Sequence, residues 1–454
     1  MRRWFWSRSL VVTGLRGRIT RHYSAVANDV ERVSLTVGSS GSTIIDLHNT
    51  KDLSPQSPLL IYLPPFSTTY PDKPLQLPKF LRKTPTAVIN YRWADISPFN
   101  AFRINKVKAL VPTNRSNEEE SSPPSLSWPV PIHDITIAYD WIIKNLSPPE
   151  NQRRNVYLYG SYLGASLAVS LALTETRPHE RMAVRGCIAF NGIYNWTKFL
   201  RDHPINEPDP DPDPDLEGQD DIMSRNDAHF RQMKQYTEAL FVNPSHLFDS
   251  FASPSLFFFS PELLVPPNFT DSALSPGTSH FSHLTMEDGN GELILLFTHP
   301  RRRRLVFPPR TSTLQIPETL LLHTKPPPLS PASLKKWQQE KQKRPSLEYP
   351  GNNFQSQAEE LAKYMRASID KSEVLRSFNH EQEGGEEEDD GTDAWTKEAF
   401  RRIQTYNVGD ITNNYTLSAK GGEIVAPWLE TQFSGKPLRT SFAEDRFDPK
   451  YGRK

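Results

Sequence analysis

The segment with the clearest chemical meaning is Gly160-Ser161-Tyr162-Leu163-Gly164. An apolar run from Val156 precedes it and an Ala/Leu-rich stretch to Leu173 follows it, which predicts a strand, a tight turn and a helix. Turns of the form Gly-x-Ser-x-Gly present a serine for acyl transfer, but here tyrosine occupies that position. A phenol has an ordinary pKa of about 10 and attacks an acyl carbon only beside a strong base. The pattern therefore predicts the turn without its usual nucleophile.

Two serines beside the turn are the alternative nucleophiles. Ser161 stands one residue early, which on a sharp turn directs its side chain away from the site. Ser166 fits a Gly-x-Ser-x-Ala pattern with Gly164 and Ala168, but it falls inside the predicted helix. A serine there usually packs or bonds back to the preceding turn of the helix, and we expect this of Ser166.

The elements around this turn resemble the hormone-sensitive-lipase-like branch of the α/β-hydrolase superfamily, including fungal members of it. The elbow of that branch, Gly-Asp-Ser-Ala-Gly-Gly-Asn-Leu-Ala, aligns with Gly160 to Ala168 without a gap and places Tyr162 on the nucleophile. The other matching segments are 59–66, 87–94, 128–141, 184–190, 316–323, 354–365 and 402–408. The resemblance covers residues 30–435 with interruptions.

The resemblance implies an α/β fold, with a mostly parallel twisted sheet, helices on both faces and an inserted cap region. We expect the cap and insertions at about 200–315, where a proline- and aspartate-rich connector precedes a helix from Asn226 to Leu240. The loops at about 326–350 and 381–392 are expected to be disordered, and 436–454 to form a tail. Residues 33–37 and 43–47 predict an opening hairpin, and 256–259 and 293–297 predict short core strands.

The remaining parts of a serine-hydrolase site are altered in the sequence. The family order places the histidine base after the last strand, but the final histidine, His380, precedes that strand, so the base is predicted to be missing. We expect His323 to be a strand-end residue and not a relocated base. After His323, prolines replace the turn that carries the catalytic aspartate in the family. The next predicted helix begins at Asn352-Asn353. The residues equivalent to the oxyanion hole are Pro64, Pro65 and Leu163, and proline has no N–H to donate.

A lined crevice at the strand ends is the expected ligand site of such a fold. Aromatic residues that could converge there on Tyr162, or fill the volume left by a substrate, are Tyr62, Phe66, Tyr91, Trp93 and Tyr194. The cluster Arg301–Arg304 is a candidate for an anionic lipid head group or a protein partner, although most such runs are solvated loops.

Composition excludes several function classes. The 53 basic and 53 acidic residues balance, which gives no reason to expect nucleic acid as a partner. No apolar run reaches the length of a transmembrane segment. No zinc spacing, P-loop or dinucleotide fingerprint occurs, so the sequence predicts neither a metal nor a cofactor. The single Cys187 excludes an intrachain disulfide, as fits a reducing compartment.

The first 28 residues have the composition of a mitochondrial transit peptide. Six arginines precede the first acid, Asp29, among hydroxyl and apolar residues. The junction Arg21-His22-Tyr23-Ser24 resembles a matrix-processing sequence, with cleavage after Tyr23. We therefore expect import into the mitochondrial matrix.

The sequence favours a protein that has lost serine-hydrolase catalysis, a pseudoenzyme, and acts as a binding or assembly module for a protein partner or a small acyl or lipid ligand. One alternative is an active carboxylic-ester hydrolase that uses Ser161 or Ser166 with an unconventional base. Another is a noncatalytic sensor of a small acyl or lipid ligand.

Overall fold

The computed structural model describes residues 20–23, 30–51, 53–67, 74–94, 126–149, 151–200, 203, 225–259, 284–287, 293–296, 305–309, 312–326, 338, 342, 352–380, 391–412 and 414–434. The expected tail, the cluster Arg301–Arg304, the aspartate-rich connector and residues 381–390 lie outside this description.

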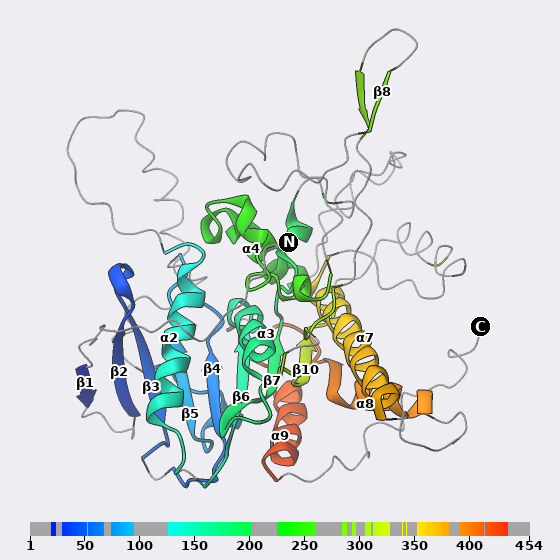
Figure 1. Cartoon of the computed structure of the whole chain (residues 1–454). Helices are drawn as coiled ribbons and strands as arrows, with labels where there is room; N and C mark the ends of the chain where they lie inside the picture. Colours follow the sequence, from blue (N-terminus) through cyan, green and yellow to red (C-terminus); the bar gives the residue numbers. More distant parts are fainter. Residues whose placement is uncertain are drawn as a thin grey trace, which may run out of the picture.

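A nine-stranded sheet organises the described part of the chain, in the order β1-β2-β3-β5-β4-β6-β7-β10-β11 (Figure 1). The strands from β5 to β11 pair in parallel, and β1, β2, β3 and β5 pair antiparallel. The bounds are β1 Thr20–Tyr23, β2 Val30–Thr36, β3 Ser42–His48, β4 Leu59–Leu63, β5 Thr86–Asn90, β6 Arg154–Ser161, β7 Met182–Phe190, β10 Glu318–His323 and β11 Ile403–Asn407. This confirms the predicted mostly parallel sheet and the strands expected within 59–66, 87–94, 184–190, 316–323 and 402–408.

The central strands are buried on both faces because helices cover both. Gly160 faces α3 (Leu163–Glu175), where a Cβ would lie 2.8 Å from the Ala168 Cβ. Tyr157 points the other way, and its ring packs edge-on against Trp428 of α9 (Ala419–Ser434). The side covered by α3 also carries α2 (Val130–Asn145) (Figure 1). Such two-sided burial explains why these strands are continuous apolar runs.

Helix α4 (Arg225–Leu240) lies above the carboxyl ends of the central strands, where a cap is expected (Figure 1). Its Leu240 carbonyl accepts hydrogen bonds from the Trp93 indole at 3.1 Å and from the Trp128 amide at 3.0 Å. The cap helix is therefore anchored on the domain body by the chain that follows β5.

A buried ion pair fixes α2 to the end of β5. The Asp134 carboxylate accepts from Arg92 Nε at 2.9 Å and Nη2 at 2.6 Å, and also from the Arg92 amide at 2.9 Å. Both side chains are buried. A bidentate pair of this kind holds orientation more firmly than a single contact.

Several predicted boundaries need correction. Residues 254–257 form a 3₁₀ helix in place of the predicted strand at 256–259, although Leu256, Phe258 and Phe259 are buried as expected. Leu293–Leu296 is a strand, β9, but it pairs with β8 (Leu284–Glu287) in a separate two-stranded sheet. The opening hairpin begins three residues earlier than predicted, at Val30.

Two long helices flank the last strand. Helix α7 (Phe354–His380) follows β10, and α8 (Gly391–Arg402) leads directly into β11.

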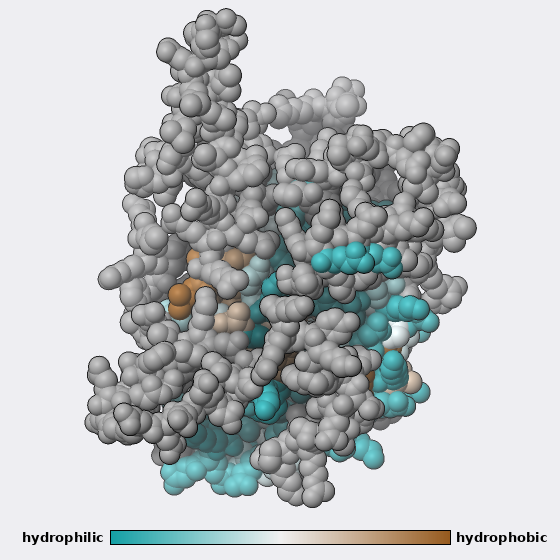
Figure 2. All heavy atoms as spheres, turned by 90° about the vertical axis from the view of Figure 1, so that its right-hand side faces the viewer, coloured by the Kyte–Doolittle hydropathy of each residue, from teal (hydrophilic) through white to brown (hydrophobic). Residues whose placement is uncertain are grey.

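On the face nearest α7, hydrophilic residues predominate among the coloured atoms and apolar ones gather in small areas (Figure 2). None of the described helices has an apolar stretch long enough to cross a bilayer.

Candidate functional site

The backbone at Tyr162 has the conformation of a strained turn. Tyr162 stands between β6 and α3 with φ 50° and ψ −113°, as the register of the motif predicts. A positive φ on a bulky residue is costly and persists only where the surroundings enforce it. Nucleophile elbows keep this geometry because it exposes the side chain at the end of the strand.

Two glycines allow the turn to close. A Cβ on Gly160 would lie 2.2 Å from the Gly164 carbonyl oxygen, and one on Gly164 would lie 2.4 Å from the carbonyl oxygens of both Leu63 and Pro64. Because these neighbours are backbone atoms, no side-chain movement relieves the overlap. The glycine spacing of the motif thus determines how closely β4, β6 and α3 approach.

The Tyr162 hydroxyl is hydrogen-bonded on both sides. Asn191 Nδ2 donates to it at 3.2 Å, and His229 Nδ1 lies 2.9 Å from it. With His229 in the tautomer that carries its proton on Nε2, the phenol donates to Nδ1. Asn191 comes directly after β7, and its Oδ1 accepts from the Thr324 amide at 2.9 Å. The elbow is thereby joined to the end of β10 and to the cap helix.

Aromatic rings from five other segments close around the Tyr162 ring. We call this set the aromatic plug: Phe66, Tyr162, Phe190, His229, Phe354 and Tyr415. The Tyr162 centroid lies 5.2 to 6.0 Å from those of the other five rings. The imidazole of His229 stacks on Tyr415 at 3.9 Å. All six residues are buried, so side chains of the chain itself fill the volume directly around the nucleophile position.

The electrostatics of the plug oppose ionisation of the phenol. Burial raises the pKa of Tyr162 above its ordinary value. Burial lowers the pKa of His229 to about 4. Both shifts disfavour the charged forms, so transfer of the phenol proton to the imidazole is uphill by several pK units. The pair is a neutral hydrogen bond at pH 7.

The oxyanion-equivalent atoms are engaged within the chain. The Leu163 amide, which follows the nucleophile position, donates to the Pro65 carbonyl at 3.2 Å. The Pro64 carbonyl accepts from the Tyr91 hydroxyl at 2.8 Å. Pro64 and Pro65 offer no N–H. Of the three oxyanion-equivalent residues, only Leu163 has an amide N–H, and the Pro65 carbonyl accepts its hydrogen bond.

A histidine does reach the elbow, contrary to the expectation from chain order. His229 comes from the cap and not from the chain after β11, and neither its place in the sequence nor its spacing to Gly160–Gly164 signals the contact. The loop after β11 instead supplies Tyr415, at φ 55°. Its hydroxyl donates to Gln232 Oε1, so this loop also contacts the cap helix.

His323 and the two asparagines have structural contacts. His323 is buried at the end of β10, with Nδ1 3.1 Å from the Thr324 carbonyl, and burial lowers its pKa. Asn353 caps α7 by accepting from the Ser356 amide at 2.9 Å. Asn352 accepts from Gln357 Nε2 at 2.8 Å. These contacts are those of a strand-end residue and of a helix terminus.

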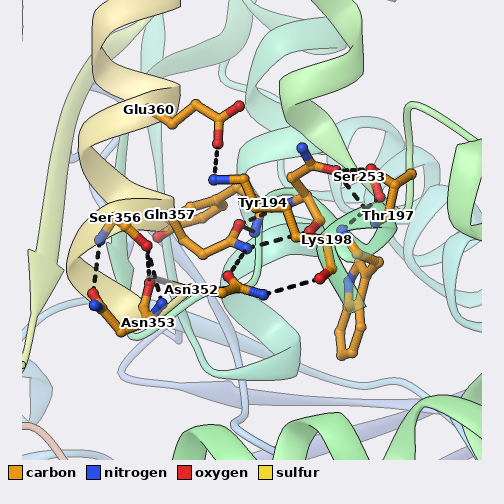
Figure 3. A network of polar contacts seen from close by, with 11 residues as sticks. Tyr194, Thr197, Lys198, Ser253, Asn352, Asn353, Ser356, Gln357 and Glu360 are labelled. Carbon is orange, nitrogen blue, oxygen red and sulfur yellow. Dashed lines mark hydrogen bonds and ion pairs between the residues drawn. The ribbon is translucent and has the colours of Figure 1, made fainter. Parts of the chain in front are cut away.

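The polar network at the start of α7 holds the loop after β7 in place (Figure 3). Gln357 Oε1 accepts from the amides of Tyr194 and Asn195 at 3.0 and 2.8 Å. Lys198 and Glu360 form a buried ion pair across the same junction (Figure 3). This network supports the segment that carries Asn191.

Neither alternative serine lies free at the turn. Ser161 is buried and shares side-chain hydrogen bonds with the phenols of Tyr62 and Tyr159. Ser166 is buried in α3 and its hydroxyl donates to the Leu163 carbonyl at 3.0 Å. The predicted back-bonded role of Ser166 is confirmed.

Of the predicted pocket aromatics, Phe66 packs directly on the Tyr162 ring. Tyr62 stacks on Tyr159 at 5.1 Å. Trp93 packs with Trp128, Trp196 and Phe241 beneath the cap. Tyr91 bonds to Pro64, and Tyr194 packs against Gly192. Among the described ring contacts, the expected convergence on Tyr162 is therefore seen for Phe66.

No protein-family model matches the sequence, and no curated protein matches it significantly. Solved structures that it resembles include carboxyl esterase 2 of the fungus Tuber melanosporum, with a TM-score of 0.40 and 11% identity over 92% of this chain and 90% of that one. An esterase of Rhizomucor miehei gives 0.39 and 9% over 90% and 84%. A hormone-sensitive lipase from a metagenome library gives 0.32 and 12% over 77% and 75%. The parallel sheet and the elbow between β6 and α3 give this chain an α/β-hydrolase-like fold.

Proposed function

We propose that this chain is a catalytically inactive protein of the α/β-hydrolase fold, a pseudohydrolase that acts as a binding or assembly module. The observation that carries the proposal is the state of Tyr162. Its side chain occupies the nucleophile position, its hydroxyl is bonded to Asn191 and His229, and its ring is enclosed by the aromatic plug. An acyl substrate would need the space that these rings fill.

The oxyanion-equivalent atoms support the same proposal. Catalysis of acyl transfer depends on N–H donors directed at the developing oxyanion. The Leu163 amide donates to Pro65 instead. Loss of one such donor in a working enzyme costs about 10²–10³ in kcat.

The alternative of an active carboxylic-ester hydrolase depends on Ser161 or Ser166. The contacts of Ser161 with two buried phenols, and of Ser166 with the Leu163 carbonyl, weigh against it. Burial of the same serines also separates them from an ester in solvent. A small acyl or lipid ligand could enter the site only if the aromatic plug opened. We therefore prefer a protein partner to such a ligand.

The hydrolysis of short p-nitrophenyl esters tests the proposal. The full chain should turn over these esters no faster than Tyr162→Phe, which keeps the ring and removes the hydroxyl. Ser161→Ala and Ser166→Ala are the matched controls. Turnover that disappears in either serine variant would support the esterase alternative and contradict the proposal.

We also propose import into the mitochondrial matrix, on the strength of the arginine-rich segment 1–28 and the junction after Tyr23. A fusion of residues 1–30 to a fluorescent protein should be mitochondrial, and replacement of Arg16, Arg18 and Arg21 by glutamate should abolish import. Fluorescence of the unaltered fusion in the cytosol or the secretory pathway would refute mitochondrial targeting. A pull-down from purified mitochondria would then identify the partner.

A further inference from the structure

Among the residues that the structure describes, those that pair with the outer edge of β2 cover only part of it. On its inner side β2 pairs with β3 over all seven residues, Val30 to Thr36. On its outer side it pairs with β1 over four, from Glu31 to Ser34. Strand β1 is the last strand of the sheet (Figure 1). Edge strands of this kind present backbone donors and acceptors that can pair with any extended segment.

Strand β1 has few backbone contacts that hold it to the sheet. It consists of four residues, and β2 is its one partner strand among the described residues. The conformational entropy lost by ordering four residues is similar in size to the net contribution of the hydrogen bonds they form. The short connection from Tyr23 to Val30 favours docking by raising the local concentration of β1 at the edge. Backbone pairing by itself therefore holds β1 to β2 only weakly.

We propose that the outer edge of β2 is a strand-acceptor site, and that its occupant is this chain's own segment Thr20–Tyr23, which exchanges between docked and free forms. The acceptor side rests on β2, whose buried Val33 and Leu35 fix its register on the core. The bound segment runs antiparallel, with Thr20 opposite Ser34 and Tyr23 opposite Glu31.

This site has a consequence for the junction after Tyr23. The residues on its amino-terminal side are those paired with β2, so docking and cleavage at this bond compete. Processing after Tyr23 would remove the occupant and leave the β2 edge open. This consequence rests on the proposed import, whereas the acceptor site does not.

A labelled peptide of residues 17–26 tests the site on the full chain. In Arg21→Pro/His22→Pro, the prolines fall at two consecutive residues, so one of them removes an N–H that faces β2, which undocks β1 and frees the edge. The matched control, Arg21→Ala/His22→Ala, changes the same side chains and keeps the backbone N–H groups. Fluorescence anisotropy should show at least tenfold tighter peptide binding to the proline variant than to the alanine variant or the unaltered chain.

A disulfide lock tests exchange separately. Thr20→Cys/Ser34→Cys joins two directly opposed residues, whose Cα separation in an antiparallel pair suits a disulfide. Cys187 is buried and does not compete. The oxidised form should bind no peptide, and reduction should restore the weak binding of the unaltered chain. Equal binding by the oxidised and reduced forms would overturn the proposal, as would failure of the folded proline variant to bind.

Discussion

The backbone of the elbow and the side chains above it differ in how closely they match the geometry of a nucleophile elbow. The backbone has the strained turn at Tyr162 and the two glycines that permit close approach of β4 and α3. The side chains form the aromatic plug, with a Tyr162–His229 hydrogen bond at the tip of the turn. The comparison teaches that fold and chemistry depend on different atoms of the same five-residue motif.

The largest effect should come from emptying the plug. Tyr162→Ala removes a buried ring and should lower the free energy of unfolding by about 3–5 kcal/mol. Tyr162→Phe keeps the ring but leaves His229 and Asn191 without their shared partner, and should cost about 1–2 kcal/mol. Urea denaturation of both variants measures the difference. Equal costs would mean that the hydroxyl, and not the packing of the ring, dominates.

The backbone side of the comparison is tested at Gly164. Gly164→Ala places a Cβ against two backbone carbonyls and should destabilise the chain by about 2–3 kcal/mol. Gly422→Ala in α9 is the control, because the nearest atom to its Cβ would be Phe80 Cδ1 at 4.0 Å. That change should be neutral or stabilising. Similar losses at both positions would show that close approach at the elbow is not the cause.

Much of this backbone could be predicted from the sequence, since apolar runs, the glycine spacing and the helical stretch to Leu173 are local signals. The plug could not. His229 and Tyr415 belong to segments that meet only through the cap and the loop after β11, and no spacing in the chain links them to Tyr162. The strand at 256–259 was wrongly predicted because an apolar run signals burial without specifying backbone conformation.

Acid should weaken the plug to a smaller extent. The pKa of His229 is about 4 in the folded chain and about 6.5 when unfolded, so the folded form binds fewer protons between these values. Stability should therefore be complete above about pH 6.5 and fall as the pH approaches 4. His48 and His323 shift in the same direction. His229→Phe should reduce, without abolishing, the loss of thermal midpoint between pH 7 and pH 5; an unchanged loss would exclude His229 as its source.

The smallest effect is expected at Ser166. Its hydroxyl bonds back to Leu163 within α3, so Ser166→Ala should change the free energy of unfolding by about 1 kcal/mol or less. Equilibrium denaturation measures this. A loss of several kcal/mol would reveal a packing role that the hydrogen bond alone does not explain.

Labelling by a fluorophosphonate probe, with the modified residue located by mass spectrometry, tests the central claim most directly. The unaltered chain should give no adduct on Ser161, Tyr162 or Ser166. Tyr162→Ser should also remain unlabelled, because a serine hydroxyl stands one bond beyond Cβ and falls short of His229, which meets the far end of the phenol. An adduct at any of these positions that disappears when the protein is denatured would show an activated nucleophile and contradict the account.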